Sequence, residues 1–371
     1  MICPNTQPDV VIVGAGPAGC SAAIRLARAG HSVTVCEGAI FPRRKVCGGC
    51  LSGDAVALLV DLLGEKVAGL GTPVTRITFG IGRRTFSTFG DEHCRIVRRD
   101  ILDATLAEEA AAAGARLEFG QRAEIVEESR GSFSIRTAAR YWQPRWIIWA
   151  AGLTDLVKHE NLKRQDLNRA MIGQAWSVAP MDVCPPVGEI AMHWLQGGYV
   201  GLATVSPVEC LVGLAVERNG SGSRKPSDIL RAANSKADVL QVLELPTVAP
   251  KLGTANFPHR PKHVGYGNVL IAGDAAGFEE PFSGEGIGQA LRSGLAAARA
   301  VLTDDANDFV ISHYRKQLRQ HRRVRRRTRW LSQILRNRVV FTFADSHLPG
   351  LETIGGHLLR GVHVNSVTEG I

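Results

Sequence analysis

The sequence predicts an α/β fold in which a Rossmann-like domain is combined with a second domain built on a mixed β-sheet and with a helical C-terminal tail. Residues 10–13 are a short unbroken apolar run, which is typical of a strand buried on both faces of a parallel sheet. A glycine-rich turn follows, and residues 21–29 have a helical periodicity that ends at Gly30. Residues 32–36 have the composition of a second strand, so these elements form a βαβ unit.

Strands of two kinds are predicted further along the chain. Residues 145–151 and 268–272 are largely apolar and should join the parallel sheet, and an Ala-rich amphipathic helix is predicted over residues 100–113. Alternation of polar and apolar residues indicates antiparallel strands near residues 75–79, 85–89, 170–177, 189–195, 199–205 and 210–216. These alternating strands predict the second, mixed sheet.

The same patterns divide the chain into three regions. We expect a discontinuous cofactor-binding domain, a substrate domain that contains the alternating strands, and a basic helical C-terminal region. Their boundaries are 1–70 with 95–160 and 262–310 for the first, 71–94 with 161–261 for the second, and 311–371 for the third.

Composition indicates a globular protein of the cytoplasm. With 371 residues the chain is long enough for two domains, and 45% of its residues are hydrophobic. It has no apolar run of the roughly 18 residues that are needed to cross a bilayer, and its first residues lack the basic region of a signal peptide. The eight cysteines lack paired spacing, apart from Cys47 and Cys50, which favours reduced thiols and therefore a cytoplasmic location.

The positive charge is concentrated in one segment. The net charge is +9, but residues 311–340 contain ten Arg, one Lys and no acidic residue, so the remainder of the chain carries −2. The densest run, Arg322 to Arg329, lies in the predicted C-terminal helix. It has three interpretations: a solvated helix face, peripheral contact with the inner surface of a membrane, or docking of an acidic acyl-carrier partner. Nucleic acid is not expected as a partner, because no recognition motif accompanies the charge.

The turn after the first predicted strand has the spacing of a dinucleotide-binding motif. The first glycine permits a tight turn, the second lets a pyrophosphate approach the backbone, and the third lets the helix pack closely on the strand. The helix N-terminus then faces the phosphates. Glu37 ends the second predicted strand, 23 residues after the first glycine, where a carboxylate can accept hydrogen bonds from ribose hydroxyls. The motif residues are Gly14, Gly16, Pro17, Ala18 and Gly19.

A second glycine-containing turn follows residues 268–272. It begins with Gly273 and Asp274, and this Asp can accept hydrogen bonds from the ribityl hydroxyls of a flavin. A helix is predicted to start near Gly284, and its amides can stabilise negative charge on the reduced flavin ring. Pro281 and Phe282 are expected to form the wall beside the flavin. The contacts expected at the helix start are Gly284, Glu285, Gly286 and Ile287.

The two turns, in this order, resemble those of a large flavoprotein superfamily that includes aromatic hydroxylases, flavin-dependent halogenases and geranylgeranyl reductases. Residues 43–49, Arg-Arg-Lys-Val-Cys-Gly-Gly, look like the R-x-K-x-C-G-G segment of the geranylgeranyl reductase-like group. The resemblance covers about residues 9–330 and implies FAD, oxidoreductase activity and a small hydrophobic substrate. It also implies that Arg99 lies near the pyrophosphate and that Ala123, in the strand after Gly114, meets the adenine. Further contacts implied by the resemblance are Arg44, Lys45, Cys47 and Gly48.

Two departures from the superfamily motifs bear on the reaction. Where relatives carry D-G-x-x-S, residues 151–155 read Ala-Gly-Leu-Thr-Asp, so NAD(P)H is expected only as a transient electron donor, or a partner protein supplies the electrons. Residues 197–205 lack the Trp and Pro of the halogenase and prenyl reductase motifs. A halogenase is therefore not expected. We prefer a monooxygenase of an aromatic or polyketide-like compound. One alternative is a geranylgeranyl reductase-like enzyme that reduces carbon–carbon double bonds, and another is a flavin-carrying binding or carrier-docking protein without turnover.

The sequence contains no clear general acid or base. The Cys47 and Cys50 thiols have C-x-x-C spacing, which is compatible with a redox disulfide or with half of a zinc site. No second Cys or His pair has metal-ligand spacing, so zinc is not expected. The resemblance accounts for Cys47 without dithiol chemistry and leaves Cys50 as a small apolar residue. The candidates for a catalytic role are Cys47, Pro281, Phe282 and Glu285, followed by Glu279, Glu280 and His193.

Overall fold

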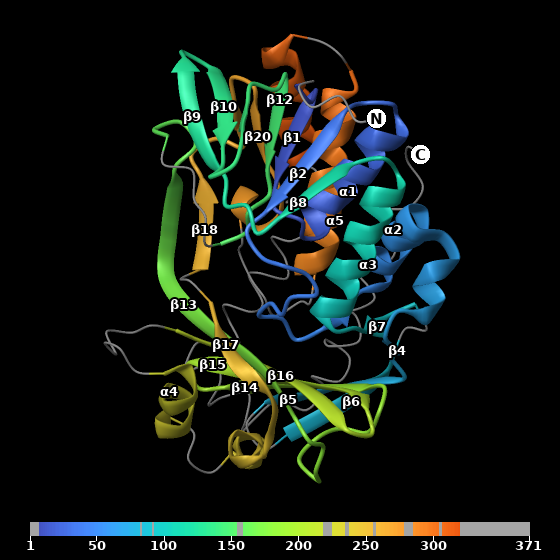
Figure 1. Ribbon diagram of the computed structural model, residues 1–371. Coiled ribbons are helices and arrows are strands. Elements are labelled where there is room, and N and C mark those ends of the chain that lie inside the picture. The colour runs from blue at the N-terminus through green and yellow to red at the C-terminus, as the bar shows by residue number, and fades with distance from the viewer. Residues whose placement is uncertain are drawn as a thin grey trace.

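The computed structural model combines a six-stranded, largely parallel sheet with a larger sheet that lies below it in Figure 1. A long strand, β13 (Arg164–Val178), extends from the level of the first sheet into the second. The structure describes residues 7–81, 84–90, 93–153, 159–217, 225–233, 237–254, 257–277, 285–303 and 306–319.

The first sheet contains the buried strands that the sequence predicts. β1 pairs in parallel with β2 on one side and with β12 on the other, while β20 and β8 extend the sheet in parallel and β19 is antiparallel to β20. The βαβ unit is therefore confirmed. In spatial order the strands are β19 (Gly265–Tyr266), β20 (Val269–Ile271), β12 (Trp146–Trp149), β1 (Val10–Val13), β2 (Val33–Glu37) and β8 (Arg116–Phe119).

The two faces of this sheet bury different layers. Val10 and Ile12 face a helical layer that contains α1 (Pro17–Arg28), α3 (Arg99–Ala112) and α5 (Gly286–Val301), whereas Val11 and Val13 face a small three-stranded sheet. That small sheet consists of β9 (Glu124–Ser129), β10 (Ser132–Arg136) and β11 (Tyr141–Trp142). Because alternate residues of β1 are buried on both sides, the strand is apolar throughout, as its sequence indicates.

Helices α1 and α5 pack closely although about 270 residues separate them. A Cβ atom on Gly294 of α5 would lie 2.0 Å from the Ala18 carbonyl oxygen of α1, so only glycine permits this approach. The Ser21 hydroxyl of α1 donates to the Leu291 carbonyl of α5 at 3.2 Å. This contact packs the helix that follows the first glycine turn against the helix that follows the second glycine turn.

The second sheet is mixed, as predicted. Its neighbours are antiparallel except for the parallel pair β5 and β14. One face packs on α4 (Pro226–Ala233) and on the 3₁₀ helix η2 (Asp238–Glu244), and the opposite face is turned toward the first sheet. The strand order is β17 (Thr247–Gly253), β13, β16 (Glu209–Glu217), β15 (Gly198–Ser206), β14 (Glu189–Leu195), β5 (Arg76–Ile81) and β6 (Arg84–Phe89), with β18 (Phe257–Pro261) also on β13.

A connecting region between the two sheets is not predicted by the sequence patterns. The helix α2 (Gly53–Leu63) starts at Ser52, whose hydroxyl accepts from the Ala55 amide at 3.4 Å, and the 3₁₀ helix η1 (Gly64–Gly69) follows. Two-residue strands form a third sheet here, with β7 (Arg95–Ile96) between β3 (Cys50–Leu51) and β4 (Thr72–Pro73).

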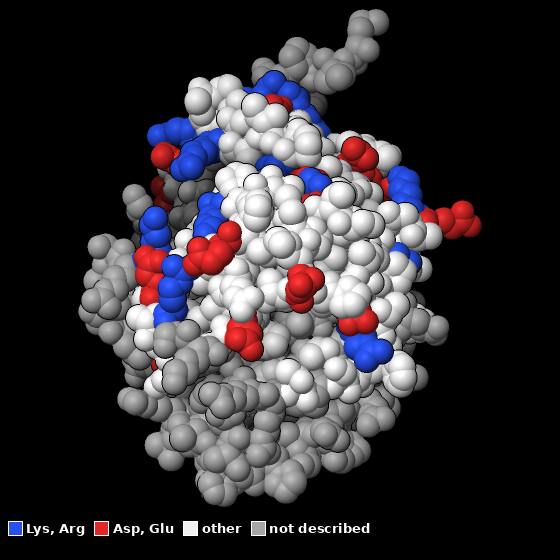
Figure 2. Space-filling model, turned by 90° about the horizontal axis from the view of Figure 1, so that it is seen from below, with Lys and Arg blue, Asp and Glu red and all other residues white. Residues whose placement is uncertain are grey.

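The end of the described chain is helical over residues 307–319, in agreement with the predicted C-terminal helix as far as it is described. The Tyr314 hydroxyl donates to the Ile271 carbonyl at 2.6 Å and fixes this helix on the first sheet. The Arg322 to Arg329 run lies outside the described residues. Seen from below, the described surface has few charged side chains in its central part, and its Lys and Arg side chains lie mainly toward the margins (Figure 2). Among the helices that the structure describes, none is long and apolar enough to cross a membrane.

Candidate functional site

The turn between β1 and α1 has the geometry of a phosphate-binding turn. Gly14 has a φ of 102°, and a Cβ atom there would lie 2.5 Å from the Ala150 carbonyl oxygen. On Gly19 a Cβ atom would lie 1.8 Å from the Gly14 carbonyl oxygen, which explains the close contact of helix and strand. In contrast, the nearest neighbour of a Cβ atom on Gly16 would be the Arg43 side chain at 3.7 Å.

The N-terminus of α1 is left open by the same turn. Its N-cap residue is Gly16, no side chain caps the helix, and Pro17 occupies the first turn. The first amides of a helix lack intrahelical partners and favour a negatively charged ligand. The open side of Gly16 and the uncapped helix therefore fit a dinucleotide pyrophosphate.

Glu37 lies beside this turn at the end of β2. Its Oε2 atom accepts from the Ala15 amide and its Oε1 atom accepts from the Ala39 amide, both at 2.9 Å. These bonds hold the carboxylate at the carboxyl end of the parallel strands, where the sequence predicts that it meets a ribose.

A buried charge cluster lies behind the turn. The Asp103 carboxylate is fully buried and accepts from Arg99 through both oxygens, at 2.9 and 2.8 Å, and from Arg43 at 2.9 Å. Arg43 also lies 3.8 Å from the Glu37 carboxylate and over the Phe41 ring. Burial opposes the charge on Arg99, but the Asp103 carboxylate more than offsets this effect and raises the pKa of the guanidinium.

Arg43 and Asp103 were missed as site residues. Arg43 is the first arginine of the R-x-K-x-C-G-G segment, and Asp103 lies four residues after Arg99 on a helix, so both had a signal in the sequence. The predicted contact Arg44 is exposed, its guanidinium donates to the Pro250 carbonyl of β17 at 3.2 Å, and it lines the pocket described below. Of the two neighbouring arginines, Arg43 therefore lies closer to the glycine turn.

The second glycine turn lies at the end of β20. Gly273 has a φ of 65°, and its amide donates to the Ser293 hydroxyl of α5 at 2.8 Å. The Asp274 carboxylate lies 3.4 Å from the Lys45 ammonium, so the turn and the R-x-K-x-C-G-G segment meet here. Ser293, which no motif indicated, ties the turn to α5.

Helix α5 begins at Gly286, two residues after the predicted position. Its N-cap residue Glu285 is buried and makes no side-chain cap, so the first amides of the helix have no such partner. Ile287 is buried in the first turn. The predicted wall and contact residues Pro281, Phe282 and Gly284, and the candidates Glu279 and Glu280, lie outside the described residues.

The Cys-Gly-Gly loop lies between the two sheets, and its two glycines have different environments. Gly49 is buried with a φ of 76°, and a Cβ atom there would lie 2.4 Å from the Leu211 Cδ1 atom of β16. Gly48 is exposed, and a Cβ atom on it would have no neighbour within 4 Å. A Cβ atom on Gly213 of β16 would lie 3.5 Å from the Gly48 Cα atom, so the loop touches the second sheet.

The two thiols of the loop are separate in the structure. Cys47 and Cys50 are both free, and the Cys47 Sγ atom accepts from the Gly49 amide at 3.3 Å. Burial raises the pKa of the Cys50 thiol to about 12, so this group is protonated and unreactive at neutral pH.

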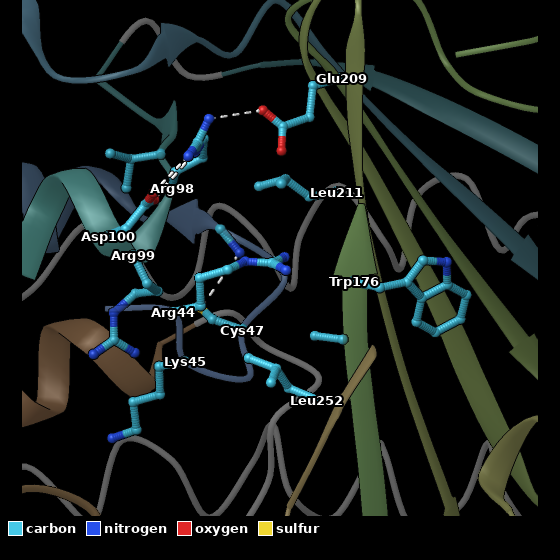
Figure 3. Close-up of a pocket in the computed structure, with 13 residues that line it drawn as sticks. Arg44, Lys45, Cys47, Arg98, Arg99, Asp100, Trp176, Glu209, Leu211 and Leu252 are labelled. Atoms are coloured by element: carbon cyan, nitrogen blue, oxygen red, sulfur yellow. Dashed lines mark hydrogen bonds and ion pairs between the residues drawn. The ribbon is translucent and has the colours of Figure 1, made fainter. Parts of the chain in front are cut away.

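A pocket lies between the loop and the second sheet (Figure 3). The Arg98 guanidinium points at Glu209 of β16, with Nη1 3.1 Å from Oε2, and it also pairs with Asp100. The Trp176 ring is turned away from Cys47, to the other side of its strand. The lining residues from the segment that contains the Cys-Gly-Gly loop and from the start of α3 are Arg44, Lys45, Cys47, Gly49, Val97, Arg98, Arg99 and Asp100. The lining residues from the second sheet are Ala175, Trp176, Glu209, Leu211 and Leu252.

The face of the second sheet that meets the loop is largely apolar. The strand register places Tyr199, Met192 and Phe79 on the same face as Gly213 and Leu211. Tyr199 and Phe79 are buried, and the Phe79 ring stacks on Trp194 with centroids 5.8 Å apart. This face can shield an apolar substrate from water.

The structure places two further residues of the sequence analysis. His193, a candidate for a catalytic role, is paired with Gly80, on the face of the sheet opposite to Met192, and therefore points away from the Cys-Gly-Gly loop; burial lowers its pKa. Neighbouring residues of a strand lie on opposite sides of the sheet, which explains the difference between His193 and Met192. Ala123 does not lie in the strand after Gly114, which is β8, but in the link between β8 and β9, where it is half-buried.

In the part of the chain that the structure describes, no group of three or more His, Cys, Asp and Glu side chains could hold a metal ion. The features that could hold a cofactor are the two glycine turns, Glu37 and the Lys45–Asp274 pair. They lie at the carboxyl ends of the parallel strands or on the loops beside them, which is the usual ligand site of such sheets.

Comparison with known proteins shows what this chain is similar to. Residues 9–159 match the family model for FAD dependent oxidoreductases. A menaquinone reductase of Mycobacterium tuberculosis is 29% identical over 333 residues, which cover 81% of this chain and 78% of that protein.

Two solved structures share the fold. A geranylgeranyl bacteriochlorophyll reductase-like protein of Thermoplasma acidophilum is 19% identical with a TM-score of 0.76, covering 96% of this chain and 95% of that one. The myxobacterial chondrochloren halogenase CndH is 18% identical with a TM-score of 0.72, covering 85% of this chain and 80% of that one. The family match over residues 9–159, the likeness to a menaquinone reductase and the paired glycine turns together lead to one conclusion: this chain is an FAD-dependent oxidoreductase, and its fold is shared by a geranylgeranyl bacteriochlorophyll reductase-like protein and a halogenase.

Proposed function

We propose that this enzyme reduces a carbon–carbon double bond in a hydrophobic substrate of the isoprenoid or isoprenoid-quinone class. The observation that carries the proposal is the position of the Cys47-Gly48-Gly49 loop, which touches Gly213 on the apolar face of the second sheet. A substrate held between this loop and that face would contact apolar side chains of the sheet, among them Leu211 and Met192. The 29% identity to a menaquinone reductase supports a reductase over an oxygenase.

In this proposal the first sheet and its loops bind FAD, and the second sheet binds the substrate. FAD supplies the electron-transfer chemistry when it is bound. Glu37 would hold the adenosine end, the uncapped start of α1 would face the pyrophosphate, and Asp274 would accept from the ribityl chain. Gly48 would leave space beside the ring, because its exposed side has no neighbour within 4 Å. The electrons would come from NAD(P)H bound transiently or from a partner protein.

Hydroxylation of an aromatic or polyketide-like compound is the second candidate. It is favoured by Gly201 and Ala203 of β15, which lie on the same face of the sheet as Gly213. They belong to the stretch of residues 197–205, where the motif of prenyl reductases has bulky residues. The Met192 side chain occupies the space beside Gly201, where a Cβ atom would lie 2.8 Å from its sulfur, so a fused aromatic substrate would require this flexible side chain to move. This candidate requires O₂ to reach the reduced flavin.

Anaerobic single-turnover kinetics distinguishes the two reactions. The FAD-loaded enzyme is photoreduced without oxygen and mixed with menaquinone, with a geranylgeranyl lipid or with an aromatic polyketide, and flavin absorbance is followed. We expect reoxidation by a menaquinone or a geranylgeranyl lipid, with two hydrogen atoms gained by the product in mass spectrometry. Reoxidation that requires O₂, with one ¹⁸O atom incorporated from ¹⁸O₂, would contradict the proposal and support hydroxylation.

A matched pair of variants locates the substrate. Met192→Ala changes the face of the second sheet that meets the Cys-Gly-Gly loop, whereas His193→Ala changes the opposite face of the same strand. We expect Met192→Ala to raise the KM for the substrate with little change in FAD content, and His193→Ala to leave KM unchanged. Equal effects of the two variants would indicate that the substrate does not lie on this face.

A further inference from the structure

Two cysteines outside the flavin site are held next to each other by the second sheet. Cys184 lies in the loop between β13 and β14, in a turn where its amide donates to the Met181 carbonyl at 2.7 Å. The next residue, Pro185, accepts from the Thr204 hydroxyl of β15. Thr204 is paired across the strands with Cys210 of β16, so the loop is fixed over Cys210.

The two thiols belong to the same hydrophobic cluster and differ in exposure. Cys184 is half-buried and packs on the hydrophobic cluster that contains Cys210, which is fully buried. Interaction with the Cys210 side chain lowers the pKa of Cys184 to about 6, and interaction with Cys184, together with burial, raises the pKa of Cys210. The accessible sulfur is thus mainly thiolate at neutral pH, and the buried sulfur keeps its proton.

We propose that Cys184 and Cys210 form a reversible disulfide when the protein meets hydrogen peroxide. The Cys184 thiolate attacks one peroxide oxygen and the O–O bond breaks, which leaves a sulfenic acid on Cys184 and releases hydroxide. The Cys210 sulfur then attacks the Cys184 sulfur and displaces water after its proton is transferred. The two thiols lose two electrons to the peroxide, and the products are one disulfide and two molecules of water. A dithiol reductant reverses the reaction.

The disulfide would constrain β16, a strand that forms one wall of the pocket beside the Cys-Gly-Gly loop. It would tie the loop that contains Cys184 to β16, whose opposite face contributes Glu209 and Leu211 to the pocket. It would also close the chain segment 184–210, and a cross-link of this kind restricts the unfolded state. The oxidised protein should therefore unfold at a higher temperature than the reduced protein.

Peptide mass spectrometry tests the bond directly. The full-length, FAD-loaded protein is treated with hydrogen peroxide, alkylated and digested with trypsin without reduction. No Lys or Arg lies between residues 170 and 217, so both cysteines fall on one tryptic peptide that contains no other cysteine. We expect this peptide to lose two hydrogen atoms, to resist alkylation, and to regain both properties after dithiothreitol. Cleavage after Glu189 should leave its two halves joined.

Variants complete the test. In Cys210→Ser, the Cys184 sulfenic acid should persist and react with dimedone, and Cys184→Ser should remove both products. Cys94→Ser, which changes a buried cysteine of a different cluster, should leave the disulfide unaffected. Oxidation of wild-type Cys184 to sulfinic acid without the cross-link, or formation of a Cys47–Cys50 bond in its place, would overturn the proposal.

Discussion

Arg98 at the start of α3 and Glu209 on β16 form an ion pair, with Nη1 3.1 Å from Oε2, that joins the FAD-binding part to the second sheet. Glu209 is buried, while the Arg98 side chain is 40% exposed and also pairs with Asp100. The pair lines the pocket beside the Cys-Gly-Gly loop. Its position makes it a link between flavin position and pocket shape.

Removal of this link should destabilise the protein and loosen the pocket. We expect Glu209→Ala to cost about 1 kcal/mol, since it leaves a partly screened Arg98 and removes a buried hydrogen bond. Urea unfolding of the FAD-loaded protein measures this value. Glu244→Ala breaks the exposed ion pair with Arg231 and should cost no more than about 0.5 kcal/mol. Equal costs for the two variants would contradict a linking role for Glu209.

The two glycines of the loop should respond differently to substitution. Gly49→Ala should lower the thermal stability of the protein with and without FAD, by about 2 kcal/mol or more, because φ is positive and Leu211 and Val97 leave no space. Gly48→Val should leave the stability of the apoprotein nearly unchanged and impair flavin binding or turnover. Calorimetry of both forms and flavin titration distinguish the outcomes. Wild-type turnover in Gly48→Val would show that the open side of Gly48 does not face the site.

FAD binding should depend on the carboxylate of Glu37. We expect Glu37→Ala to raise the Kd for FAD by about 10- to 100-fold, in line with about 1.5–3 kcal/mol for hydrogen bonds to a charged group. Titration of the apoprotein by flavin fluorescence measures it. Glu37→Gln retains an acceptor for the Ala15 or the Ala39 amide and separates this structural role from the ribose contact. An unchanged Kd in both variants would remove Glu37 from the binding site.

Cys50 should be dispensable for the reaction. Its pKa is raised to about 12 by burial, so it cannot supply a thiolate at neutral pH. Cys50→Ser should keep the flavin spectrum and at least half of the turnover, with a stability cost of about 1 kcal/mol for burying a hydroxyl. Complete loss of turnover with an intact flavin spectrum would instead support dithiol chemistry with Cys47.

Stability at acid pH should depend on Glu109. Hydrogen bonds from Lys66 and Arg28, at 2.6 and 2.7 Å, lower the pKa of this carboxyl below its usual 4.5. The carboxylate therefore stabilises the fold above pH 4.5, and this contribution is lost as the pH falls through the lowered pKa. Glu109→Gln should show a smaller loss of unfolding free energy across this range. Glu108→Gln, which changes the exposed neighbour, should retain the wild-type slope.

The sequence predicts those parts of the fold that local patterns determine. The βαβ unit was predictable because β1 is apolar throughout and because Gly14 and Gly30 delimit the helix. The two-residue strands β3, β4 and β7 are too short to show a period. The first six residues of β13, from Arg164 to Arg169, were missed because their pairing with β18 involves residues almost 100 positions away.

The sequence identifies the candidate site residues that lie in motifs, but its prediction of the residues between the motifs is incomplete. Glycine spacing identifies both turns, but a sequence does not contain φ, so Gly48 and Gly49 looked equivalent. The Arg43–Asp103 pair joins residues 60 positions apart, and nothing local distinguishes Arg43 from Arg44 as the partner. The side of β14 on which His193 lies depends on register with β5, which the sequence does not give.

The contact of Gly294 with Ala18 has a consequence for biosynthesis. On the ribosome, the helix α1 is made well before its partner α5, which follows about 270 residues later. The N-terminal segment must therefore wait, with one side of its helix uncovered, until most of the polypeptide has been translated. Long-range closure of this kind slows folding and exposes the nascent chain to aggregation. Yield in a heterologous host should accordingly depend on chaperone supply and on slow, cool expression more than on the intrinsic stability of the finished protein.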